Sequence, residues 1–188
     1  MKYYSEFGED KFLNEKEKLP KKGIFVDVGA GGTENSNSLF FEEKGWECLC
    51  IEPDKRHEGL EKRKLVDHSI VGSSNKMVDF TFHRLPQLNG IFHGNKSSEK
   101  MQMVTLDSIL EKYSINDIDI LSIDVEGNEI GVLKGISLEK YKPTYIIVEY
   151  TNQFKGNCYK YTVEILKKFG YEEIYKTQSN LIFKRKDK

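Results

Sequence analysis

The chain has 188 residues and a formal net charge of −1, and 38% of its residues are hydrophobic. This length suffices for one domain with a sizeable core, and the balanced charge argues against the basic surface of a nucleic-acid-binding domain. No stretch is apolar over a membrane-spanning length, and the first residues lack the apolar run of a secretory leader. We therefore expect a cytoplasmic protein without membrane insertion, whose cysteines are reduced.

Hydrophobic periodicity along the chain predicts strands that alternate with helices. The expected strands cover residues 24–28, 47–51, 68–71, 77–83, 118–123, 145–148, 172–175 and 181–184. The expected helices cover residues 36–44, 57–64, 106–113, 129–133 and 161–169. Residues 84–102 contain Pro86, Gly90 and Gly94 and are expected to form the longest irregular loop of the chain.

Alternating strands and helices are typical of an α/β domain in which helices cover both faces of a mostly parallel sheet. The expected architecture is therefore three-layered and Rossmann-like. The last two strands have no helix between them, so one of them is expected to run antiparallel at an edge of the sheet. No repeat, low-complexity run or linker divides the chain, which predicts a single domain over residues 1–188.

The first expected strand contains an acid, Asp27, and runs directly into the glycine-rich loop 29–32. The second strand ends at Glu52, about 20 residues further on, which is the spacing at which an acid meets ribose hydroxyls. In parallel sheets, ligands bind at the carboxyl ends of the strands. The pattern predicts an adenosine-containing ligand.

The residue at the third position of the glycine pattern distinguishes between such ligands. A dinucleotide-binding loop has a third glycine where this chain has Glu34, which would meet a pyrophosphate at the helix start. S-adenosylmethionine carries a sulfonium and an ammonium and no phosphate, so acids such as Asp27 and Glu52 suit it. Two alternatives stay open: Asp27 is tied only to backbone amides of the loop, and Glu34 is a solvated acid.

Further acids follow two later strands. Asp124, Glu126 and Glu129 come at the end of strand 118–123, and Glu149 ends strand 145–148. Their repulsion must be relieved by a cationic ligand, a metal ion or backbone donors. Asp124, Glu149 and Asn152 are candidate ligands of a divalent metal, since they offer hard oxygen atoms. In the alternative reading, Glu126 caps the next helix and Glu129 faces water.

Several short motifs, taken in order, resemble the FkbM-type methyltransferase family. The resemblance runs from Tyr3 to Glu149, and the ordered set carries it rather than any single motif. The motifs are Tyr4–Asp10, Phe25–Ala30, Ser36–Ser38, Gly45–Trp46, Ile51–Pro53, Val104–Asp107 and Ile123–Gly127. The family is similar in fold to seven-strand methyltransferases that use S-adenosylmethionine, and it is associated with O-methylation of hydroxyls, often on sugars or natural products.

The resemblance implies a set of cofactor-binding residues. It places Asp27, Gly29 and Gly31 around the methionine part of the cofactor, Glu52 at the ribose, and the turn 71–72 near adenine. The full expected set is Asp27, Gly29, Ala30, Gly31, Asn37, Glu52, Pro53, Val71, Gly72 and Asp124. Two positions depart from the family pattern: Glu6 stands where the family commonly has glutamine, and residues 89–91 read Asn-Gly-Ile where it commonly has Ser-Gly.

The expected function is O-methylation, by S-adenosylmethionine, of a hydroxyl on a sugar, a glycan or a small natural product. Asp124 and Glu126 are the candidate catalytic residues that would assist a poorly nucleophilic hydroxyl, with His93 as a second choice. The turn at residues 124–127 lacks the Pro-Pro-aromatic pattern of nucleic-acid amino-methylating enzymes, so a nucleic-acid partner is not expected.

Residues 1–22 are expected to cover the site, and residues 84–103 to face the acceptor. Two other classes stay open: a non-catalytic cofactor- or partner-binding module with the same fold, and a nicotinamide-dependent oxidoreductase.

Overall fold

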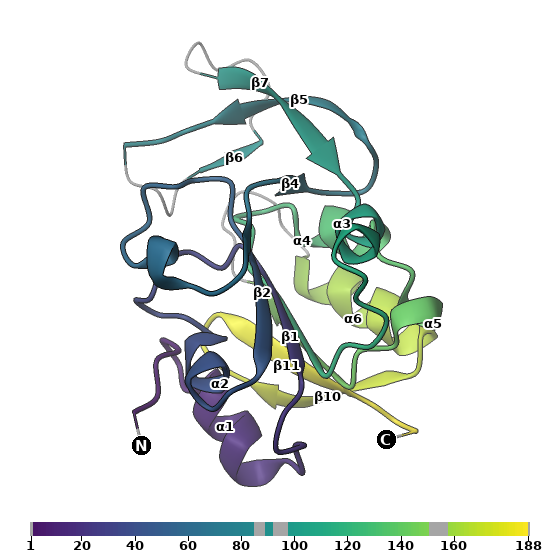
Figure 1. The fold of residues 1–188 in the computed structure, drawn as a ribbon. Coiled ribbons are helices and arrows are strands. Elements are labelled where there is room, and N and C mark those ends of the chain that lie inside the picture. Colours follow the sequence, from purple (N-terminus) through teal and green to yellow (C-terminus); the bar gives the residue numbers. More distant parts are fainter. Residues whose placement is uncertain (1, 85–88, 92–97, 151–157, 188) are drawn as a thin grey trace.

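The structure, a computed structural model, describes residues 2–84, 89–91, 98–150 and 158–187. These residues form a mixed α/β fold built on a mostly parallel seven-stranded sheet, consistent with a Rossmann-like class (Figure 1). In order across the sheet, the strands are β10 (Tyr171–Lys176), β11 (Asn180–Arg185), β9 (Tyr145–Glu149), β8 (Ile120–Ile123), β1 (Ile24–Val28), β2 (Glu47–Ile51) and β3 (Val66–Asp67). The sequence predictions for β1 and β2 are confirmed to the residue.

The antiparallel strand of this sheet is β11, which lies one place inside the edge. It pairs antiparallel with β9 and with β10, and β10 occupies the edge. One antiparallel strand was the correct expectation, but its expected place at the edge is wrong. The reason is polarity: residues 181–183 of β11 are fully buried, whereas Glu172 and Glu173 of β10 are exposed, and charged strands suit sheet edges.

The described residues contain six α-helices and one 3₁₀ turn. They are α1 (Glu9–Lys16), α2 (Leu39–Glu43), α3 (Leu106–Lys112), α4 (Glu129–Lys134), α5 (Leu138–Tyr141), α6 (Cys158–Lys168) and η1 (Leu60–Lys62). The helix expected at residues 57–64 is wrong, because Gly59 has a left-handed φ of 79° and only η1 follows it. α2 starts later than residue 36 because Ser36 Oγ accepts the N–H of Leu39 at 3.1 Å.

Hydrophobic residues on the two faces of the sheet form separate clusters. Alternation along β1 sends Phe25 to one face and Val26 and Val28 to the other. Phe25 packs with side chains from α1 and α2, and the opposite cluster takes side chains from α3, α4, α5 and α6. Figure 1 shows this division, with α1 and α2 on one side of the central strands and α3, α5 and α6 on the other.

A second sheet of four strands stands at one end of the first. Its order is β4 (Ile70–Val71), β7 (Ser98–Val104), β5 (Lys76–Thr81) and β6 (Gly90–Ile91), and it lies at the top of Figure 1. The strand expected at residues 68–71 is confirmed only at residues 70–71, because residues 68 and 69 connect β3, in the first sheet, to β4, in the second. Ile70, Val78, Phe80 and Met103 form the buried core of the second sheet.

The prediction of one irregular loop over residues 84–102 is wrong where β6 and β7 form. β7 pairs antiparallel with β5 from Ser98, opposite Thr81, to Met103, opposite Lys76. Met101 and Met103 both pack in the core of the second sheet, and the exposed Gln102 lies between them, which is the period of a half-buried strand. Glutamate and lysine are depleted in strands, and Glu99 and Lys100 stand at the start of β7, so the composition hides the strand.

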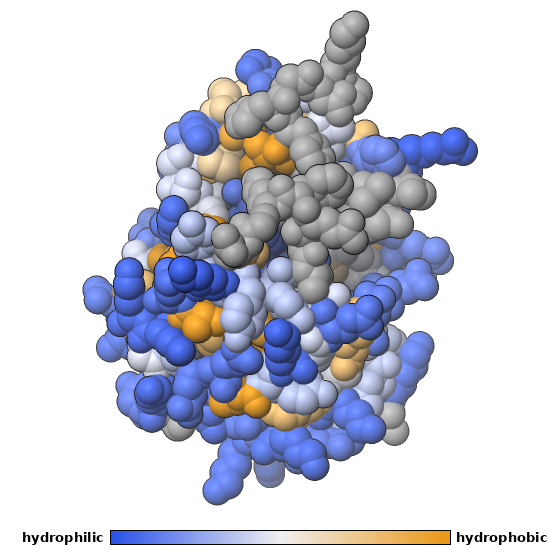
Figure 2. Space-filling view, turned by 180° about the vertical axis from the view of Figure 1, so that it is seen from behind, coloured by the Kyte–Doolittle hydropathy of each residue, from blue (hydrophilic) through white to orange (hydrophobic). Residues whose placement is uncertain are grey.

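The outer surface is mostly hydrophilic on the face seen in Figure 2, with apolar residues in small separate patches. Among the described residues, the large apolar side chains that are exposed are Leu65, Met77, Tyr159, Tyr161, Phe169 and Tyr175. Scattered residues of this kind are normal on a folded domain. Within the part of the chain that the structure describes, no helix combines the length and apolar character needed to cross a membrane.

Candidate active site

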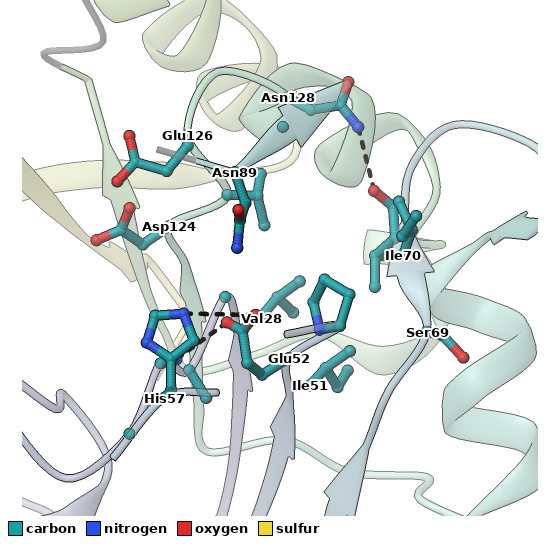
Figure 3. A pocket seen from close by; sticks show the side chains of 18 of the residues that line it. Val28, Ile51, Glu52, His57, Ser69, Ile70, Asn89, Asp124, Glu126 and Asn128 are labelled. Atoms are coloured by element: carbon teal, nitrogen blue, oxygen red, sulfur yellow. Dashed lines mark hydrogen bonds and ion pairs between the residues drawn. The ribbon is translucent and has the colours of Figure 1, made fainter. Parts of the chain in front are cut away.

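A cavity of about 580 Å³ lies at the carboxyl ends of β1, β2 and β8. The loop 29–32 and Glu52 line it from the first sheet, Asp124 and Glu126 follow β8, and Phe80 and Ile91 reach it from the second sheet. In Figure 3, Glu52, Asn89 and Asp124 lie around a common space. This is the end of a parallel sheet at which ligands bind.

The glycine-rich loop packs too tightly against its neighbours for side chains at two positions. A Cβ added at Gly29 would lie 1.6 Å from the backbone oxygen of Asp124, and one at Gly32 would lie 1.9 Å from that of Glu58. Gly29 also has a φ of 80° and donates its N–H to Ile51 O at 2.8 Å. The loop is therefore held against both β2 and β8, and its backbone is exposed to the cavity.

Glu52 is a buried acid at the end of β2 whose side chain reaches the cavity. Its Oε2 accepts the N–H of Gly31 at 3.2 Å, and its Oε1 accepts the N–H of Asp54 at 2.9 Å. Burial raises the pKa of Glu52 to about 7 in spite of these two hydrogen bonds, with a further upward contribution from Asp54 and Asp27. The carboxylate is fixed in position and titrates near neutral pH.

This raised pKa predicts how stability changes with pH. The unfolded chain loses the Glu52 proton near the ordinary pKa of 4.5, before the folded chain does, so ionisation opposes folding as the pH rises from 4.5 to about 7. We expect Glu52→Gln to gain free energy of unfolding relative to the wild type by about 2 kcal/mol between pH 5 and pH 8. Urea unfolding at both pH values measures this gain. Glu61→Gln, at an exposed acid, should show none, and parallel pH curves for Glu52→Gln and the wild type would contradict the expectation.

Asp124 and Glu126 form the acidic wall of the cavity. Asp124 follows β8 and donates its N–H to Val28 O at 2.9 Å, and Glu126 has a left-handed φ of 54°. In Figure 3 the two carboxylates lie side by side and point in the same direction. Burial is the main cause that raises the pKa of Asp124 well above its usual range, and the nearby charges of Glu149 and Glu126 raise it further. Burial, Glu149 and Glu129 likewise raise the pKa of Glu126 to about 7.

Glu129 holds the turn that presents these acids. It is 1% exposed, and its Oε1 accepts the N–H of Gly127 at 2.7 Å and that of Val125 at 3.3 Å. The alternative in which Glu129 faces water is therefore wrong. Glu126, in turn, lines the cavity. A left-handed φ is unusual for glutamate, and such strained residues persist where the surrounding structure fixes them.

The structure brings most of the expected cofactor residues together. Those that line the cavity are Gly29, Ala30, Gly31, Glu52, Pro53, Val71 and Asp124. Glu6 and Glu34 line it as well, and both are exposed. The N-terminal segment therefore reaches the site through Glu6.

Three expected cofactor residues lie away from the cavity lining. Asp27 points to the face of β1 that carries Phe25, away from Val28, which lines the cavity. There its carboxylate accepts a hydrogen bond from the hydroxyl of Ser38 at 2.5 Å. Asn37 donates its side-chain amide to Ser122 Oγ at 3.1 Å. Gly72 packs against Met103 instead, so closely that a Cβ added at Gly72 would lie 2.2 Å from the sulfur of Met103. The partner of the buried acid Asp27 is thus a hydroxyl of the chain itself.

The expected metal ligands are only partly covered by the structure. Glu149 ends β9 close enough to Asp124 to raise its pKa, while Asn152 and the candidate catalytic residue His93 lie outside the described residues. Among the residues that are described, no three histidine, cysteine, aspartate or glutamate side chains are grouped as metal ligands. Metal binding stays a prediction from the sequence.

Sequence reasoning did not single out His57 or Asn128, both of which line the cavity, and it named Asn89 only as part of the acceptor-facing segment. Asn128 donates its side-chain amide to Val71 O at 3.1 Å. Asn89 donates to Asp54 Oδ2 at 2.6 Å and accepts the N–H of His83 at 2.6 Å, so it joins the second sheet to the loop after β2. Asn128 stands inside the acid-rich turn 124–129 and Asn89 precedes Gly90, so both lay within motifs already noted, whereas the segment of His57 carried no such motif.

Comparison with known proteins places these observations in a family. A family model described as a methyltransferase FkbM domain matches residues 27–173, which is most of the chain. The chain belongs to the FkbM methyltransferase family. The resemblance drawn from the short motifs is thereby confirmed, and the match includes the glycine-rich loop, Glu52, the acidic turn and the second sheet. A search of the curated proteins found no match.

Proposed function

We propose that this member of the FkbM methyltransferase family is an S-adenosylmethionine-dependent O-methyltransferase with a three-layer Rossmann-like fold. One observation carries the proposal: the cavity at the carboxyl ends of β1, β2 and β8 is bounded by a glycine-rich loop and by the buried carboxylate of Glu52. This donor set fits the cofactor. Glu52 can accept hydrogen bonds from ribose hydroxyls, and the glycine-rich loop leaves its backbone accessible to a ligand. The acids that line the cavity favour a ligand with cationic groups.

The acidic wall supports a role in proton transfer. S-adenosylmethionine, when bound, supplies a methyl group that is activated by positive sulfur. A hydroxyl acceptor must lose its proton, and the carboxylate of Glu126 would accept it, with Asp124 beside it to orient the hydroxyl. A pKa of about 7 suits a general base, because about half of the group is ionised at neutral pH and the carboxylate is more basic than an ordinary one.

We propose a hydroxyl of a sugar, a glycan or a small natural product as the acceptor. The second sheet supports this choice, because Phe80 and Ile91 give the cavity an apolar wall while Asn89 adds an amide. A lining that combines apolar side chains with a few polar groups suits a sugar ring, whose faces are apolar and whose hydroxyls form hydrogen bonds. No nucleic-acid partner is proposed.

The proposal is tested by calorimetric titration with S-adenosylmethionine and, separately, with NAD. We expect the wild type to bind S-adenosylmethionine and Glu52→Ala to bind it at least tenfold more weakly, because the ribose acceptor is lost. Transfer of labelled methyl groups to a panel of sugars, glycosides and small hydroxyl compounds then tests turnover. Binding of NAD instead would favour an oxidoreductase, and binding of S-adenosylmethionine without turnover on any acceptor would favour a non-catalytic module.

Glu126→Gln separates binding from turnover. The substitution keeps the shape of the side chain and removes its basicity, so we expect kcat to fall about 100-fold or more while the dissociation constant for S-adenosylmethionine changes less than threefold. Steady-state kinetics and titration measure the two quantities. Glu61→Gln is the matched control, since Glu61 is exposed and outside the cavity lining. An unchanged kcat would remove Glu126 from the role of base.

A further inference from the structure

His57 stands at the cavity opposite Glu52, and the family motifs assign it no role. Its Nε2 lies 3.7 Å from Glu52 Oε1, and Figure 3 shows the imidazole and the carboxylate facing each other. Both side chains line the cavity, and their exposed fractions are 19% and 8%. A separation of 3.7 Å is too long for a direct hydrogen bond between the two groups.

The backbone fixes His57 in this place. Thr33 donates its N–H to Glu58 O at 3.0 Å, and Gly32 approaches the same oxygen so closely that no Cβ would fit. The imidazole consequently lies over Gly31, where an added Cβ would be 3.6 Å from Nδ1. The segment that carries His57 is thus packed against the glycine-rich loop.

The carboxylate of Glu52 is fixed from the other side. Gly31 and Asp54 each donate a backbone N–H to one of its two oxygens, so turning the carboxylate toward His57 would break these hydrogen bonds. The gap between Nε2 and Oε1 is therefore a built feature of the cavity. A hydroxyl oxygen can lie at about 2.8 Å from both atoms at once, because the two atoms are only 3.7 Å apart. Glu52 Oε1 can accept this further hydrogen bond, since an ionised carboxylate oxygen accepts more than one.

The charge state of His57 suits such a bridge. Burial lowers its pKa, Arg56 acts in the same direction, and Asp54 acts against them. A neutral imidazole has one N–H donor and one acceptor. With the donor at Nε2, a hydroxyl can accept from the imidazole and donate to Glu52.

We propose that His57 and Glu52 bind one ribose hydroxyl of the cofactor between them, which makes His57 a residue that selects ribose over deoxyribose. This inference rests on the proposed function, since it requires an adenosine-containing ligand. Glu52 alone would accept a hydrogen bond from either hydroxyl of the ribose. His57 adds a second contact that only one of the two hydroxyls can make.

A cycle of protein and ligand variants tests the contact. Calorimetry would give the affinity of the wild type, His57→Ala and His57→Gln for S-adenosylhomocysteine and for its 2′-deoxy and 3′-deoxy analogues. We expect His57→Ala to weaken S-adenosylhomocysteine about fivefold or more. The same substitution should change the affinity for one of the deoxy analogues less than twofold, because that ligand lacks the bridging hydroxyl. His57→Gln keeps an N–H donor and should recover part of the loss.

His83→Ala is the matched control, since His83 is exposed and does not line the cavity. Equal weakening of all three ligands by His57→Ala would show that His57 only supports the loop and would overturn the inference. An unchanged affinity for S-adenosylhomocysteine in His57→Ala would overturn it too. If the wild type bound none of the adenosine ligands, the proposed function itself would fail, and the inference with it.

Discussion

Replacing Gly29 by alanine is expected to abolish binding of S-adenosylmethionine and to lower the free energy of unfolding by about 3 kcal/mol or more. The added Cβ would lie 1.6 Å from Asp124 O and 2.6 Å from its carbonyl carbon, and both are backbone atoms. The loop cannot retreat, because the N–H of Gly29 is bonded to Ile51 O. The ends of β1 and β8 would have to separate, and the cavity would lose its shape.

Urea unfolding and calorimetric titration of Gly29→Ala measure both effects. Gly45→Ala is the matched control: Gly45 has a φ of 89°, and an added Cβ there would meet nothing within 4 Å. It should cost about 1 kcal/mol of unfolding free energy from its left-handed conformation and leave ligand affinity unchanged. Similar losses in the two variants would mean that backbone conformation, and not contact with Asp124, decides the effect.

Replacing Arg63 by methionine is expected to lower the free energy of unfolding by about 3–5 kcal/mol. Arg63 is 6% exposed and donates through Nε to the carboxylate of Glu42, which is 5% exposed. It also donates through Nη2 to Ser38 Oγ at 2.7 Å, and Ser38 in turn bonds Asp27. Methionine fills similar volume but leaves Glu42 as a buried charge without its cation.

Chemical denaturation of Arg63→Met and of the double variant with Glu42→Gln tests this account. The double variant removes the stranded charge, so its loss should be smaller than the sum of the two single losses. Lys62→Met, at the exposed neighbouring position, should change the unfolding free energy by less than 0.5 kcal/mol. A loss below about 1 kcal/mol in Arg63→Met would show that Glu42 finds another partner or takes up a proton.

The parts of the fold that the sequence predicted well are those with a strong local signal. β1 and β2 are short apolar runs with glycine, proline or acid at their ends, and both are confirmed to the residue. β7 was missed because its lysine and glutamate are residues that strands usually avoid. The position of β11 could not be predicted locally, since it depends on which of two neighbouring strands is more apolar.

The candidate site shows the same limit. The glycine loop and Glu52 were predicted because backbone geometry and strand ends leave marks in the sequence. Asp27 was expected at the ligand, but strand alternation directs it to the face of the sheet that carries Phe25, where it accepts a hydrogen bond from Ser38, 11 residues further along the chain. His57 gave no signal, because its position follows from the packing of residues 57–59 on residues 31–33, a contact between segments far apart in the sequence.

The chain enters the second sheet through β4 and leaves it through β7, and these two strands lie side by side. β4 and β7 are parallel neighbours, with Ile70 beside Met103 and Val71 beside Val104, and Gly72 donates its N–H to Val104 O at 2.9 Å. Residues 73–103 therefore form an excursion whose two ends meet, so their length and composition can change without moving the seven-stranded sheet. The wall of the cavity that carries Phe80, Asn89 and Ile91 belongs to this excursion. Under the proposed function, a change confined to this excursion would alter the acceptor side of the cavity and leave the glycine-rich loop and Glu52 in place on the seven-stranded sheet.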